Sequence, residues 1–182
     1  MNLYLLALRI HVPGWLARRK VQELFEATAS ACGTVPPDLK GLSLEQRLEQ
    51  YALFTRDEIG RKIRGGEDMQ QLKEILHRHA CRLGTEIRTR LRLRSTEDVL
   101  SAGRVLYRTI GIDFEGDTSG AVVIRRCYFS RFYDAAICSV MSALDSGIAA
   151  GLTAGKELRF TRRITEGSPT CEAILDGSGE GS

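Results

Sequence analysis

The chain has 182 residues, 43% of them hydrophobic and 27% charged, and its formal net charge is +3. This length suffices for one domain with a sizeable core, and the composition is that of a globular protein, not of a fibrous or low-complexity one. The net charge is too small to indicate nucleic-acid binding, and the Arg-rich segment 78–94 lacks the aromatic residues that single-strand binders interleave. No apolar run approaches the roughly 20 residues that span a bilayer. We therefore expect neither a nucleic-acid partner nor a transmembrane segment.

An apolar segment, residues 3–12, precedes Trp15 and the basic residues Arg18, Arg19 and Lys20. Such a segment could lie on a membrane surface. We expect instead a helix that docks on the core of the protein or on a partner subunit. In the latter case the chain forms a homo-oligomer through its N-terminal helix.

Helical spacing and capping signals dominate the chain to about residue 110. Ser43 opens the sequence Ser-Leu-Glu-Gln, a capping box, and Ser95 is a second N-cap with acidic residues after it. The paired prolines Pro36 and Pro37 exclude helix from the loop between. Residues 87–94 alternate as a strand would, but their apolar positions continue the preceding helical spacing, so we extend that helix. Together these signals predict helices over residues 14–31, 43–65, 67–91 and 95–110.

After Gly111 the pattern changes to short β-rich segments. Residues 112–115 and 121–124 flank a Gly-rich turn, which predicts a β-hairpin. Ser130 is expected to cap a helix that runs through about Ala150 and that Gly151 ends. A second hairpin is predicted from strands over residues 157–165 and 170–175.

The predicted fold class is therefore α+β. An N-terminal helical layer is followed by β-hairpin, helix and β-hairpin, and the four antiparallel strands pack one face against the long helix. We expect a single domain over residues 1–176, helical over about 1–110 and mixed over about 111–176. Residues 177–182 are predicted to be a flexible tail because they carry too little apolar surface to pack.

The five cysteines indicate a reducing compartment. Their number is odd, none forms a Cys-x-x-Cys pair, and the opening MNLYLLALRI lacks the basic start and cleavage site of a signal peptide. We therefore expect free thiols and a cytoplasmic location. The cysteines are Cys32, Cys81, Cys127, Cys138 and Cys171.

Three of these thiols are candidates for a site. Cys127 closes the second strand, Cys138 lies in the helix that follows, and Cys171 lies in the last strand, so the predicted fold could bring them together. Cys127 sits beside Arg125 and Arg126 near a helix start, where the pKa of a thiol is lowered and the thiolate is nucleophilic. The alternative is that all three pack as small hydrophobic residues. Their spacing matches no ordinary zinc module, and the chain has no nucleotide-binding glycine motif, so we expect no metal and no cofactor.

A spaced pattern runs from residue 126 to residue 172. It consists of Arg126-Cys127, Tyr133, Cys138, Asp145, Gly155, Phe160-Thr161-Arg162, Thr165-Glu166-Gly167 and Cys171-Glu172. This pattern resembles the C-terminal half of the L-2-aminothiazoline-4-carboxylate hydrolase family. It is also similar to vinyl-reductase-like small-ligand domains, which share a Glu-Gly…Cys ending. The resemblance covers roughly residues 110–176, and this chain has Tyr128 where the family has proline.

The resemblance implies a hydrolase that opens a small ring containing sulfur and nitrogen, with a small molecule as its partner. It implies that a thiol acts as nucleophile or positions the substrate, that a carboxyl moves protons, and that an arginine holds a substrate carboxylate. A non-catalytic domain that binds a small ligand, or a metal through its thiols, remains the alternative, as does an oligomerising interaction protein. The candidate catalytic residues are Cys127, Cys138, Cys171, Glu166 and Asp145, and the candidate substrate-binding residues are Arg126, Arg162 and Tyr133.

Overall fold

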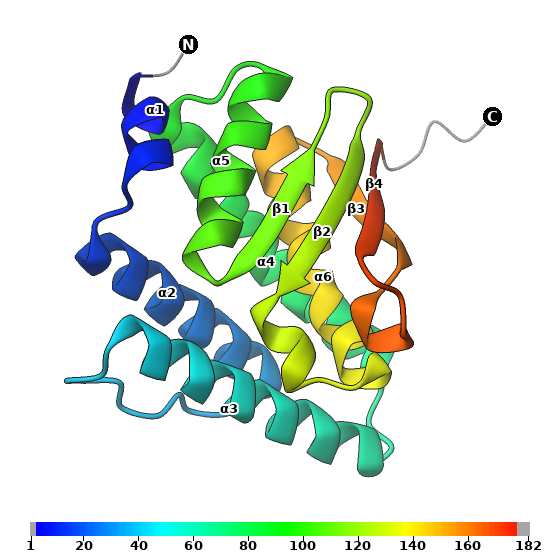
Figure 1. The fold of residues 1–182 in the computed structure, drawn as a ribbon. Coiled ribbons are helices and arrows are strands. Elements are labelled where there is room, and N and C mark those ends of the chain that lie inside the picture. The colour runs from blue at the N-terminus through cyan, green and yellow to red at the C-terminus, as the bar shows by residue number, and fades with distance from the viewer. Residues whose placement is uncertain (1–2, 178–182) are drawn as a thin grey trace.

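A computed structural model describes residues 3–177, which form a helical layer followed by a sheet and its covering helix (Figure 1). The predicted α+β class, with helices first and a helix between two hairpins, is confirmed. The tail expected at residues 177–182 lies outside the described residues, apart from Gly177, which ends the last strand. The helices are α1 (Leu3–Ile10), α2 (Gly14–Cys32), α3 (Leu44–Arg64), α4 (Met69–Leu91), α5 (Thr96–Thr109) and α6 (Ala135–Thr153). The strands are β1 (Ile112–Gly116), β2 (Ala121–Cys127), β3 (Lys156–Arg162) and β4 (Cys171–Gly177), and the 3-10 turns are η1 (Tyr128–Arg131) and η2 (Ile164–Glu166).

The strands form one antiparallel sheet in the order β1-β2-β4-β3, so each hairpin contributes an edge strand and a central strand. In the central pair, Val122 lies opposite Ala173 and Ile124 lies opposite Cys171, and all four are buried. Side chains alternate along a strand, so this set defines the face that the helices cover (Figure 1). The opposite face carries ion pairs such as Arg125–Glu115, at 2.6 Å.

Capping residues set where three of the helices begin. Ser43 and Gln46 form a complete capping box at α3, and Ser95 and Asp98 form another at α5, as the sequence predicts. Helix α4 begins at Met69, two residues later than expected, because the Asp68 carboxylate accepts hydrogen bonds from the first backbone amides.

Helix α6 begins and ends later than predicted. Its N-cap is Asp134, whose carboxylate accepts a hydrogen bond from Ile137 N at 2.8 Å. Ser130 lies in η1 instead, where its hydroxyl donates to Cys127 O at 2.8 Å. The helix also continues past Gly151 to Thr153, so the expectation that this glycine ends it is wrong.

Gly151 belongs to a contact between α6 and α4 that only glycine permits. A Cβ placed on Gly84 of α4 would lie 2.5 Å from Ile148 O of α6. A Cβ on Gly147 or Gly151 would lie still closer to a carbonyl oxygen of α4. Real Cβ atoms do not approach oxygen this closely, so the two backbones meet here without intervening side chains.

One described helix, α6, is long and apolar enough to cross a bilayer by length and composition alone, so the expectation that no apolar run approaches that length is wrong. In this fold it packs between α4 and the sheet, and its buried residues include Val140, Met141 and Leu144. A core helix of this kind has the same composition as a membrane span, so composition does not distinguish the two.

Helix α1 docks on the rest of the chain. Leu5 and Leu8 are buried, and the Arg108 guanidinium of α5 donates a hydrogen bond to Leu8 O at 2.9 Å. This contact places α1 beside α5 and at the start of α2 (Figure 1).

Candidate ligand-binding cavity

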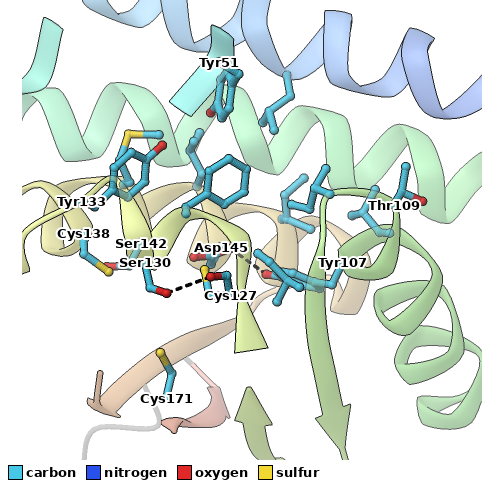
Figure 2. A pocket seen from close by; sticks show the side chains of 18 of the residues that line it. Tyr51, Tyr107, Thr109, Cys127, Ser130, Tyr133, Cys138, Ser142, Asp145 and Cys171 are labelled. Atoms are coloured by element: carbon cyan, nitrogen blue, oxygen red, sulfur yellow. Dashed lines mark hydrogen bonds between the residues drawn. The ribbon is translucent and has the colours of Figure 1, made fainter. Parts of the chain in front are cut away.

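A cavity of about 130 Å³ lies where α6 faces α2, α3 and the end of β2. Figure 2 shows side chains from several elements converging on it. Most of its wall is apolar, and the polar groups that reach it are few. Its apolar wall includes Leu83, Ile87, Ile112, Phe129, Leu144 and Ile148.

The fold brings five of the predicted site residues to this cavity. Cys138 and Asp145 lie seven residues apart on α6, which is two helical turns, so they share the face that points into the cavity. Cys127 enters from the end of β2, and Cys171 from the start of β4. Tyr133 precedes α6. All five therefore line one space, although they lie on four separate segments of the chain.

Asp145 is the carboxyl group of the cavity wall most enclosed by protein, and Tyr107 is its partner. The Tyr107 hydroxyl donates a hydrogen bond to Asp145 Oδ1 at 2.9 Å, and the Tyr107 ring stacks on Phe114 at 4.8 Å. Burial raises the pKa of Asp145 from 3.8 to about 6, and the Tyr107 bond and the charge of Arg163 oppose that rise. Asp145 keeps some accessible surface because part of it faces the cavity.

Tyr107 is a site residue that the sequence reasoning missed. The only signal was a tyrosine among the apolar positions of a helix, and a buried tyrosine hydroxyl usually finds a polar partner. Spacing along the chain does not indicate that the partner is Asp145, 38 residues away.

The three cavity thiols are neutral at physiological pH. Burial raises the pKa of Cys127 to about 12, and burial also raises the pKa values of Cys138 and Cys171. The expectation of a lowered pKa for Cys127 is not met, because burial raises that pKa and the flanking arginines are exposed and pair with Glu115 and Asp113 instead. Cys171 Sγ accepts a hydrogen bond from Ile164 N at 3.3 Å, which fixes the thiol at the cavity wall.

The other three predicted residues lie outside the cavity. Arg126 has 85% of its side chain exposed, with Asp113 at 3.8 Å. Arg162 pairs with Glu172 at 3.5 Å. Glu166 is exposed and accepts a hydrogen bond from Arg163 at 3.2 Å.

Arg163, the neighbour of the predicted Arg162, points toward the site instead. Its side chain is only 19% exposed, and its Nη2 donates to Ser142 Oγ of the cavity wall at 3.4 Å. The strand register breaks between Phe160 and Arg162, so one extra residue shifts the alternation of side chains. The sequence pattern carries no sign of this bulge, and the family resemblance indicates Arg162, not Arg163.

Two tyrosines complete the wall on the side of α3. Tyr51 Oη shares a hydrogen bond with Thr28 at 3.0 Å, and Tyr133 Oη shares one with Thr55 at 2.5 Å. These bonds hold both rings in place. The Thr165 hydroxyl also lines the cavity and opposes the larger effect of burial on the pKa of Cys138, but it has no hydrogen bond of ordinary geometry within the described chain.

A wider cleft of about 1050 Å³ adjoins the cavity and shares Cys127, Ser130, Ile112 and Ile164 with it. The two spaces are therefore neighbours across the end of β2. Five arginines and two acidic residues line this cleft, so it is positively charged. The arginines are Arg104, Arg108, Arg125, Arg126 and Arg131.

No cluster of three or more histidine, cysteine or acidic side chains within residues 3–177 could hold a metal ion. Comparison with known proteins places the chain in no family: no protein-family model, no curated protein and no solved structure matches it.

Proposed function

We propose that the chain binds a small, largely apolar molecule in the cavity at Asp145, through a hydrogen-bond donor on that molecule. The observation that carries this proposal is the enclosed carboxyl group of Asp145 in a mostly apolar wall, since the other carboxyl of the wall, Glu23, already pairs with Arg19 and Lys20. A cavity of about 130 Å³ is close to the volume at which an engineered apolar cavity accepts benzene. The ligand is therefore about the size of one five- or six-membered ring with a short substituent.

The polar partner follows from the chemistry of a carboxylate. Tyr107 supplies one hydrogen bond to Asp145 Oδ1, and an ionised carboxylate can accept several. An amine, amidine or hydroxyl group on the ligand would supply another. A cationic group would also hold Asp145 in its charged form, against the effect of burial.

A fragment series tests this binding. Benzamidine, benzyl alcohol and benzene share a ring and differ in the donor that they present to Asp145. We expect benzamidine to raise the melting temperature of the wild-type protein most and benzene least, and we expect Asp145→Asn to remove that order. The matched control is Asp176→Asn, which changes an exposed carboxyl near the end of β4. If no fragment shifts the wild-type protein, or if Asp145→Asn binds benzamidine equally well, the proposal is wrong.

A second candidate is the hydrolase activity that the resemblance implies. The observation in its favour is that the pKa of Asp145 is about 6, near the value that suits a general base at neutral pH. Water would add to the ring carbon while Asp145 takes its proton, and the proton would return to the ring nitrogen or sulfur as that bond breaks. The arginine-rich cleft would hold a carboxylate of the substrate outside the cavity. With neutral thiols, Cys127, Cys138 and Cys171 would shape the cavity and would not attack.

Hydrolysis of 2-aminothiazoline-4-carboxylate, followed by mass spectrometry of the ring-opened product, tests this candidate. We expect Asp145→Asn to lower the rate at least about a hundredfold, as loss of a general base does. We expect Cys127→Ala to retain most of the activity, because its thiol is neutral. Loss of activity in Cys127→Ala with retention in Asp145→Asn would reverse these roles.

We also propose a cytoplasmic location. All five cysteines are free, and two of them, Cys32 and Cys171, are buried. Unpaired thiols persist in a reducing compartment, which is the basis of this proposal.

A further inference from the structure

Apolar side chains are exposed at the corner where α1 meets α2. Leu6 is 37% exposed, Ile10 83% and Trp15 60%. Leu6 and Ile10 are four residues apart, so they share one face of α1, while Leu5 and Leu8 are buried on the other. Docking on α5 therefore buries Leu5 and Leu8, while Leu6 and Ile10 face outward.

Basic side chains accompany this apolar surface. Arg18 and Arg19 follow Trp15 by three and four residues on α2, so they lie on the same side of that helix. Arg18 extends back over the corner, because a Cβ on Gly14 would lie 3.5 Å from its Nη1. Glu23 is the acidic residue of this region, and it pairs with Arg19 at 2.9 Å and with Lys20.

A groove of about 350 Å³ opens beside the corner, between α1, α2, α4 and α5. Its wall is mainly apolar and includes one side of Trp15. Three charged side chains line it among the described residues, and all three are basic: Arg19, Lys20 and Arg90. Arg90 has Glu86 of its own helix at 3.9 Å.

We propose that this corner docks on the surface of a membrane that contains anionic lipids. Ile10 and Trp15 enter the interface, where tryptophan is favoured and an exposed aliphatic side chain leaves water. Arg18 and Arg90 meet the lipid head groups, whose negative charge complements the basic rim. A second copy of the chain fits this surface less well, because a two-fold contact would bring the basic rims of the two copies close together.

Trp15 makes the proposal directly measurable, because it is the only tryptophan in the chain. The full chain is mixed with vesicles of phosphatidylcholine, alone or with phosphatidylglycerol, and its fluorescence emission is recorded. We expect a blue shift with the anionic vesicles, at least about tenfold stronger partitioning than with the neutral ones, and weakening by added salt. Absence of a shift with both vesicles, together with absence of protein in the floated vesicle fraction, would overturn the proposal.

Variants that keep Trp15 as the fluorescent probe show which residues contact the vesicle. We expect Ile10→Ser to weaken vesicle partitioning about tenfold, because it removes an exposed aliphatic anchor, and Arg18→Gln to weaken it for the anionic vesicles alone. The matched control is Val35→Ser. Val35 is 86% exposed in the loop after α2, roughly 27 Å of helix from Trp15, and its loss should change nothing.

Self-association is the competing explanation, and light scattering on a sizing column separates it. If the chain is a dimer that Ile10→Ser converts to a monomer, and if Trp15 emission depends on protein concentration without lipid, the corner is an interface between copies. That result would overturn the membrane proposal.

Discussion

The Tyr107 hydroxyl and the Asp145 carboxylate lie 2.9 Å apart and join α5 to α6 at the cavity wall. Tyrosine is the donor, so the bond favours the ionised form of Asp145 and acts against the burial that raises its pKa. The pair therefore sets both the charge of the cavity and the relative position of the two helices.

Removing the donor should raise the pKa of Asp145. We expect Tyr107→Phe to move that pKa above its present value of about 6, and to lower the free energy of unfolding by about 1 kcal/mol. Carbon NMR of the aspartate carboxyl groups across a pH series measures the first effect. Tyr128→Phe, on the far side of Cys127, is the matched control, and an unchanged Asp145 titration in Tyr107→Phe would contradict the assignment.

The raised pKa of Asp145 makes the fold less stable as pH rises. The folded state holds the proton more tightly than the unfolded state, whose pKa is near 3.8, so stability is lost between about pH 4 and pH 6 and is level above. A pKa difference of about two units between the folded and unfolded states lowers the free energy of unfolding by at most about 3 kcal/mol. We expect Asp145→Asn to match the wild-type protein at pH 4 and to exceed its stability at pH 8, as measured by urea unfolding. A stability difference that is the same at both pH values would show that Asp145 does not titrate in this way.

A methyl group added at the contact of α4 and α6 should separate the helices. We expect Gly147→Ala to lower the free energy of unfolding by about 2 to 4 kcal/mol or to prevent folding, because its Cβ would overlap the His77 carbonyl. Gly60→Ala is the control, since on α3 the nearest atom to the new Cβ is the end of the flexible Arg64 side chain, at 3.2 Å. Its effect should be small or stabilising. Equal melting temperatures for the two variants would contradict the close approach.

The cavity thiols should react slowly. We expect Cys127, Cys138 and Cys171 to be alkylated by iodoacetamide at pH 7 at a small fraction of their rate in urea-unfolded protein, because the folded state keeps them protonated and enclosed. Mass spectrometry of tryptic peptides gives the rate at each site. Fast labelling of Cys127 in the folded protein, with an apparent pKa below about 8.5, would restore the nucleophile hypothesis.

Signals that act over a few residues were read correctly from the sequence. The capping boxes at Ser43 and Ser95 satisfy backbone amides within one turn, so their effect is local and visible. The convergence of Cys127, Cys138 and Cys171 followed from the order of the elements alone. The capping predictions need no knowledge of long-range packing, and the convergence of the thiols needs only the predicted sheet and its covering helix.

The errors arose where distant contacts decide the structure. Gly151 is a common helix terminator, but here it permits α4 to approach, and only the position of α4 reveals this. The bulge after Phe160 brings Arg163 inward in place of Arg162, and strand pairing determines where such a bulge falls. Tyr107 and Asp145 meet only because α5 and α6 lie side by side.

The glycine contact also separates two tasks on a single helix. Gly147 and Gly151 lie on the side of α6 that touches α4, while Cys138 and Asp145 lie on nearly the opposite side. Close backbone contact therefore fixes the distance between α6 and α4. Substitutions on the cavity side of α6 can change which ligand the cavity binds without moving the helix away from α4. The chain is therefore a suitable scaffold for redesigning ligand preference.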